Sequence, residues 1–157
     1  MKTKYINIIL AASLLSITGA CSDNDYTELD KGSTELAITA GASDLVLNET
    51  NHALEAIDLS RTTGNNYGTG NAISYTLELA ETGSDFHDPY IPVNDQQQVY
   101  FWKPMVEELN DILLNHFDVR PGDGVSLEAR VTASVAGDER VQTAVTAFSA
   151  VSYQPVT

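Results

Sequence analysis

The alternation of apolar and polar residues is strictest between Val125 and Val135, where the sequence reads VSLEARVTASV. Every second residue, starting with Val125, is apolar, and each residue between is polar. Because successive side chains of a strand point to opposite faces, this pattern predicts a half-buried strand. Its residues, at roughly 3.3 Å each, give a length of about 36 Å, which is long for a strand. We therefore expect a central strand with the rest of the chain packed around it.

Shorter segments with the same alternation, or with short apolar runs, predict six more strands. They cover residues 36–39, 44–48, 53–61, 73–79, 96–102 and 141–153. Residues 81–95 are predicted to be irregular, since Pro89 and Pro92 exclude a central strand there. In the last strand the apolar phase slips between Val145 and Phe148, which indicates a bulge.

One helix interrupts the strand pattern. Pro104 suits its first position, and Glu107 and Glu108 suit the positive end of the helix dipole, whereas Lys103 is a poor cap. The predicted apolar stripe consists of Met105, Leu109, Ile112, Leu113 and Phe117. About seven short strands separated by turns describe a mostly β, antiparallel sandwich, in which the helix crosses from one sheet to the other. The chain of 157 residues holds one such domain plus appendages.

The first 20 residues read as a bacterial signal peptide. Lys2 and Lys4 form the positive start, and residues 6–17 are an apolar run too short to span a bilayer. Small residues follow, and then Cys21. This junction resembles a lipoprotein box, in which the cysteine thiol receives diacylglycerol, although Thr18 stands where an aliphatic residue is usual. The alternative is ordinary cleavage after Ala20, which would leave a free amino-terminal cysteine.

Lipidation of Cys21 is the favoured interpretation, and several acyl chains would anchor the protein stably to the outer membrane. Residues 21–33 are polar and without periodicity, so they are predicted to form a flexible tether of about 20 Å. The acidic segment 22–25 (SDND) resembles a surface-export tag, and a merely solvated tether explains it equally well. The domain itself is expected to cover residues 34–157.

Charge limits the possible partners. The formal net charge is −14, and removal of the first 20 residues, which hold two lysines and no acid, makes it −16. Such a chain repels phosphate backbones, which excludes nucleic acid as a partner. Cys21 is the only cysteine, so neither an intrachain disulfide nor a cysteine-based zinc site can form.

Two segments resemble the amino-terminal domain of SusE-type outer-membrane lipoproteins. Residues 67–70 (YGTG) and 73–79 (ISYTLEL) are similar to the family's Y-G-x-G loop and V-x-Y-T-L strand. Residues 108–114 (ELNDILL) and 127–134 (LEARVTAS) are similar to its E-L-N-x-x-L helix and L-x-x-R-V-x-A-S strand. The resemblance implies an immunoglobulin-like or fibronectin-III-like fold, a position on the cell surface, and a place in polysaccharide utilisation. The implied partners are the proteins of a SusCD-type glycan uptake complex.

Two departures from the family pattern matter. Where the family's early strand usually reads L-x-F-x-W, this chain has Ile57, Leu59 and Arg61, so a core aromatic is replaced. Family members usually continue into carbohydrate-binding modules, whereas this sequence ends at Thr157. The family's glycan-binding residues lie largely in those modules, so they are not carried over.

No catalytic constellation is visible. Asp85, His87 and Asp88 form the one compact group of potential ligands, but a calcium ion needs six or more ligands and no known metal-site spacing is matched. His52 and His116 are isolated and are expected at the surface or at a helix end. No Gly-x-Ser-x-Gly, His-Glu-x-x-His or phosphate-loop motif occurs. We therefore expect no metal, no cofactor and no enzymatic activity.

The aromatic residues of segment 96–102 leave two interpretations. Tyr100 and Trp102 share one strand face, with Tyr90 in the adjoining loop, and sugar rings stack on exposed aromatics. Sandwich folds also commonly bury a tryptophan, and a large aromatic contributes most when buried. The favoured prediction is packing, and hence a non-enzymatic spacer or docking domain. The alternative is a stand-alone carbohydrate-binding module that uses Trp102 and Tyr100.

Overall fold

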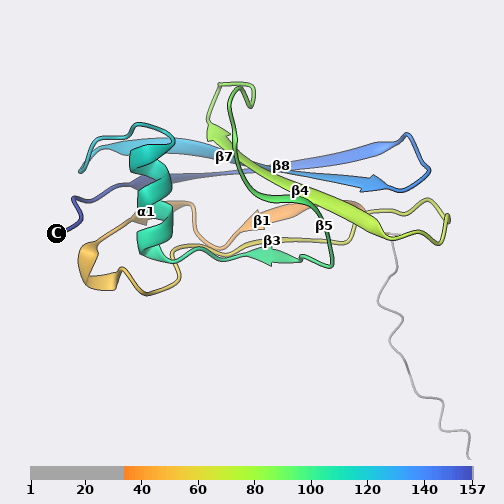
Figure 1. Cartoon of the computed structure of the whole chain (residues 1–157), viewed down its shortest axis with the longest axis horizontal. Helices are drawn as coiled ribbons and strands as arrows, with labels where there is room; N and C mark the ends of the chain where they lie inside the picture. The colour runs from red at the N-terminus through yellow and green to blue at the C-terminus, as the bar shows by residue number, and fades with distance from the viewer. Residues whose placement is uncertain (1–33, 157) are drawn as a thin grey trace, which may run out of the picture.

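The computed structural model describes residues 34–156, so the predictions for the signal peptide, Cys21 and the tether lie outside the described residues. Within that range eight strands form two sheets (Figure 1). The three-stranded sheet has the order β1 (Ile38–Ala40), β3 (Leu59–Arg61), β6 (Phe101–Trp102). The five-stranded sheet has the order β2 (Asp44–Val46), β8 (Val141–Val151), β7 (Gly124–Val135), β4 (Ile73–Glu81), β5 (Tyr90–Gln97). The predicted sandwich is confirmed, with the difference that β2 runs parallel to β8.

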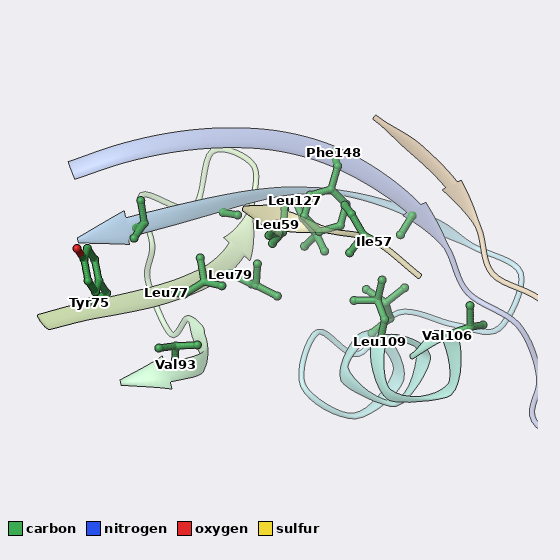
Figure 2. Packing of buried hydrophobic residues seen from close by; sticks show 14 of the residues in the cluster. Ile57, Leu59, Tyr75, Leu77, Leu79, Val93, Val106, Leu109, Leu127 and Phe148 are labelled. Atoms are coloured by element: carbon green, nitrogen blue, oxygen red, sulfur yellow. The ribbon is translucent and has the colours of Figure 1, made fainter. Parts of the chain in front are cut away.

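Strand β7 lies at the centre of the larger sheet, as its alternating sequence predicted. It pairs antiparallel with β4 on one side, from Ile73 opposite Val135 to Glu81 opposite Leu127. On the other side it pairs antiparallel with β8 along almost its whole length. Its inward side chains are almost completely buried; they are Leu127, Ala129, Val131, Ala133 and Val135. The core therefore forms on this face (Figure 2).

Helix α1 (Val106–Asn115) connects β6 of the smaller sheet to β7 of the larger one, so the predicted crossover is confirmed. Leu109 points from the helix toward the strands (Figure 2). The helix begins two residues later than predicted, because Pro104 precedes its cap, Met105. Met105 is 49% exposed rather than part of the buried stripe.

The start of α1 is held by a loop rather than by a capping side chain. The Met105 side chain makes no cap hydrogen bond. Instead, the Val106 N–H donates to the carbonyl of Leu54 at 2.8 Å, and the Glu107 N–H donates to that of His52 at 3.0 Å. These N–H groups have no partner within a helix. The loop that contains the short 3₁₀ helix η1 (Glu49–Asn51) therefore takes over the capping.

Asn110 is a buried polar residue of α1 that anchors the end of β8. Its side chain is almost completely covered, with a relative exposure of 1%. Its Nδ2 donates to the backbone carbonyl of Tyr153 at 3.1 Å, and the Tyr153 N–H donates to its Oδ1 at 2.8 Å. This pair of bonds gives the asparagine of the E-L-N motif a structural role, because the chain after β8 has no further strand to bond to among the described residues.

The structure corrects the predicted strands between β4 and α1. Residues 90–97 form the edge strand β5 despite Pro92, because the proline lies where the register with β4 shifts and where a missing N–H is tolerated. The predicted strand 96–102 is wrong in its bounds. Gln98 has a φ of 60°, which ends β5 and lets the chain cross to β6 in the other sheet. Likewise only the last part of segment 53–61 is a strand.

The predicted bulge in β8 is wrong. The register between β7 and β8 continues without a shift from Gly124 opposite Val151 to Ser134 opposite Val141. The apparent slip arises because Val141 and Val145 face solvent, with exposures of 58% and 52%. Gln142, Ala144 and Thr146, which alternate with the exposed residues, are partly buried on the face of Phe148 and Ala150, so the backbone keeps its alternation.

Replacing Asn110 by Ala should lower the free energy of unfolding by about 1–3 kcal/mol, because two backbone groups of Tyr153 would lose their partner in a buried place. Chemical denaturation measures this difference. Asn115→Ala is the matched control on the same helix, since Asn115 is exposed and bonds only to Asp111; it should change stability by less than about 0.5 kcal/mol. Equal effects of the two substitutions would contradict the role of Asn110.

Candidate functional site

The two segments that resemble the family meet on adjacent strands. Glu78 of β4 and Arg130 of β7 are opposite each other in the register, and Arg130 Nε donates to Glu78 Oε2 at 2.8 Å. The guanidinium of Arg130 also lies 4.0 Å from the centre of the Phe86 ring. The motif residues therefore clamp the β4–β5 loop onto the outer face of the sheet. This arrangement holds the loop against the sheet.

The Y-G-x-G loop lies against the β7–β8 hairpin. Tyr67, Gly68 and Gly70 all have positive φ values, between 58° and 73°, which explains the glycines. The Arg140 guanidinium lies 3.7 Å from the centre of the Tyr67 ring. Hydrogen bonds from Arg140 lower the pKa of Asp138 to about 2, so the ion pair that holds the hairpin persists in acid down to that pH.

Arg61 occupies the position where the family pattern has a tryptophan. Its guanidinium carbon lies 3.0 Å from the centre of the Tyr75 ring and 5.0 Å from that of Tyr100. Arg61 Nη1 donates to the carbonyl of Thr62 at 2.9 Å, and the Tyr75 hydroxyl donates to that of Thr63 at 2.6 Å. Burial lowers the pKa of Arg61 and raises that of Tyr75. A planar cation stacked between two rings thus replaces the missing aromatic.

The structure places the candidate aromatics on two faces of the small sheet. Trp102 is opposite the buried Leu59, is itself partly buried, and packs against the core. Tyr100 lies beside Trp102 and is 46% exposed. Phe101 is opposite Ser60 on the other face and is 58% exposed. Sequence reasoning assigned Phe101 no binding role, although its place between Tyr100 and Trp102 implied that it faces outward.

A small pocket lies between these aromatics and Arg61. Its walls also include Tyr75 and Leu59. Its volume of about 20 Å³ corresponds to roughly one water molecule, so no sugar ring fits inside. Arg61 Nη2 is buried and has no hydrogen-bond partner among the described residues. A sugar would have to stack on the exposed rims of Tyr100 or Phe101. Tyr90 does not contribute, because it belongs to β5 of the larger sheet. Its ring packs on that of His116, with the two ring centres 5.5 Å apart.

The D-F-H-D segment forms a tight turn. Asp85, Phe86 and Asp88 have φ values of 53–54°, and Phe86 is held by Arg130. The His116 ring contacts the carbonyl of Asp88, at 3.2 Å from Nε2. Within residues 34–156, no group of three or more histidine, cysteine, aspartate or glutamate side chains is placed to hold a metal ion.

A larger hollow than the aromatic pocket lies between α1, η1 and the chain after β8. It is an open groove of about 720 Å³. The carboxylates that line it belong to Glu49, Glu107, Glu108 and Asp111. Burial, with the nearby Glu49 and Glu107, raises the pKa of Tyr153 in its wall. Sequence reasoning read Glu107 and Glu108 as helix-start residues and missed the groove, because Glu49 of η1, which forms part of its wall, is distant in sequence.

Fold and site together define a β sandwich in which Arg61, Arg130 and Trp102 take part in packing. Within residues 34–156 no helix is long and apolar enough to cross a membrane. Comparison with known families matches residues 22–132 to the SusE outer membrane protein family. The match covers more than half of the chain, so this chain belongs to the SusE family, and the protein is one of the outer membrane. Comparisons with curated proteins and with solved structures gave no match.

Replacing Arg61 by Ala should lower the free energy of unfolding by about 1–3 kcal/mol, because the stack on Tyr75 is lost and a cavity remains. Arg61→Trp introduces the tryptophan of the L-x-F-x-W pattern and should cost less. Thermal and chemical denaturation measure both, and Arg120→Ala, at an exposed position, is the control. A stable Arg61→Ala variant would show that the stack contributes nothing to the fold.

Proposed function

We propose that this chain is a non-enzymatic, cell-surface lipoprotein that serves as a spacer or docking domain beside a SusCD-type glycan uptake complex. The observation that carries the proposal is the family match, which begins at residue 22, directly after Cys21. The proposed organisation is a signal peptide over residues 1–20, a lipidated tether over residues 21–33 and the sandwich domain over residues 34–157. The lipid on Cys21 holds the domain to the outer membrane.

The packing of the polar and aromatic residues supports a spacer. Among residues 34–156 the ion pairs involve three cations, Lys103, Arg130 and Arg140, and each is held by a carboxylate of the same domain. The aromatic pocket has room for about one water molecule. A rigid domain of this kind serves by its position and surface rather than by an active centre.

A stand-alone carbohydrate-binding module is the second candidate. It is favoured by the exposure of Phe101, on the edge strand β6, and of Tyr100, directly before that strand. Trp102 would form the base of such a platform. Against it, Tyr100 and Phe101 point to opposite faces of the strand, so a single sugar ring cannot stack on both.

Replacing Cys21 by Ser should release the protein from membranes, because Cys21 is the only residue that can carry the thioether lipid. Cell fractionation and mass spectrometry of the wild-type protein measure anchoring and the mass of the lipid. Ser22→Ala is the neighbouring control and should stay membrane-bound. A free Cys21 thiol in protein taken from native membranes would remove the lipoprotein proposal.

Affinity electrophoresis in soluble polysaccharides separates the two candidate functions. The spacer proposal predicts equal mobility with and without polysaccharide. Retardation that is lost in Tyr100→Ala or Phe101→Ala, and kept in the exposed control Ile91→Ala, would support the binding module instead. Trp102→Ala is included together with a denaturation curve, since Trp102 also packs against the core. Turnover of a polysaccharide in a product assay would contradict both proposals.

A further inference from the structure

The described chain enters the sandwich at the end where β7 turns into β8. Leu36 lies against Gly64, and so does Gln142 near the start of β8. Segment 62–72 and hairpin 136–140 lie at the same end of the long axis (Figure 1). We call this the hairpin end of the domain.

The chain leaves the sandwich at the opposite end. There the backbone of Tyr153, after β8, is bonded to the Asn110 side chain of α1. The Ser152 N–H donates to the carbonyl of Asp123, directly before β7, at 3.0 Å. Helix α1, η1 and the turn 120–123 make up this helix end. Strand β7 has 12 residues and runs from one end to the other, so the two ends lie about 40 Å apart.

The two ends differ in charge. Segment 62–72 holds no charged residue, and hairpin 136–140 holds two acids and one arginine. At the helix end, segment 106–123 alone holds five acids and one arginine, and Glu49 of η1 adds a further carboxylate. Of the two ends, the helix end is therefore the strongly negative one.

The hairpin end has a surface that its own hydrogen bonds hold in place. Asn71 Nδ2 donates to the carbonyl of Ala136 at 2.7 Å, which joins the loop to the hairpin. The Asn65 N–H donates to Gln142 Oε1 at 2.8 Å, which joins the same loop to β8. Thr69 and Asn71 are exposed. This end thus presents uncharged amide and hydroxyl groups on a fixed loop.

We propose that the hairpin end faces the lipid surface to which the chain is anchored, and that the helix end points away from it. The proposal rests on the lipidation of Cys21 proposed above. Cys21 stands 13 positions before Thr34, the first described residue, so the segment between them spans at most about 45 Å. With the helix end against the lipid, the point of chain entry would be about 40 Å away from it. That orientation would stretch the tether almost to its limit, at a cost in conformational entropy.

Charge favours the same orientation. Phosphates of lipid head groups repel carboxylates, and salt screens this repulsion over a Debye length of about 8 Å at physiological ionic strength. With the hairpin end toward the lipid, the carboxylates of the helix end lie several Debye lengths away from the phosphates. The amide and hydroxyl groups of segment 62–72 face the head groups instead. The acidic groove beside α1 is then presented away from the membrane.

Energy transfer from a labelled cysteine to a lipid dye tests the orientation. The full-length lipidated protein is added to preformed vesicles of phosphatidylcholine and phosphatidylglycerol. The lipid occupies the thiol of Cys21, so an introduced cysteine is the only free one. Glu139→Cys lies in the hairpin and Asp123→Cys lies directly before β7; both positions are exposed, and each change removes one carboxylate. The label at position 139 should transfer energy about twofold more efficiently or more, because the two sites differ in height by about 40 Å.

Vesicles of phosphatidylcholine alone separate the two causes. There the tether still orients the domain, so the difference between the labels should persist but be smaller than with phosphatidylglycerol at low salt. A difference that phosphatidylglycerol does not enlarge contradicts the role of charge.

Mass spectrometry of the same samples separates this proposal from the proposed function. Equal transfer from both sites, or more transfer from position 123, in a protein whose Cys21 carries the lipid overturns the orientation alone. A Cys21 without lipid in protein from native membranes contradicts the proposed function, and the orientation with it.

Discussion

The pairing of β7 with a neighbour on each side is the constraint on which the rest of the structure depends. Its alternation puts five small or aliphatic side chains on the inner face, and all of them are almost completely buried. Both long ladders, with β4 and with β8, run in register along it. A shift by one residue on either side would turn this apolar set toward solvent. The helix and the smaller sheet then pack on the apolar face of the larger sheet.

Most of the fold follows from that pattern. The β7 segment is paired on both sides, so its inner face needs apolar residues and its outer face polar ones, and the sequence shows both. The crossing helix was predictable for the same reason, since its stripe is apolar at helical spacing. Strand β5 was not predictable in this way, because an edge strand can hold Pro92 and polar residues on both faces. The bulge in β8 was wrongly predicted for a related reason. Val145 is exposed, and a strand at the sheet edge tolerates an exposed valine.

The candidate site was only partly predictable. The sequence correctly put Tyr100 and Trp102 on one face, but it could not show that Arg61 would stack between Tyr75 and Tyr100. That contact joins strands from both sheets, and no local pattern encodes it. Asn110 is a similar case. The sequence gives no reason for a polar residue beside the apolar stripe of the helix, and only the structure shows its hydrogen bonds to Tyr153. Both residues give family motif positions a role in holding the sandwich together.

The account gives this outer-membrane family member a rigid domain organised on β7, in which the conspicuous polar and aromatic residues serve the fold. Native-state hydrogen exchange tests that claim most directly. The amides between Leu127 and Ser134 should be the slowest in the chain and should open only with global unfolding, because each of these residues is paired with both β4 and β8. Fast or local exchange in β7, with slower exchange in β5 or β1, would contradict the account.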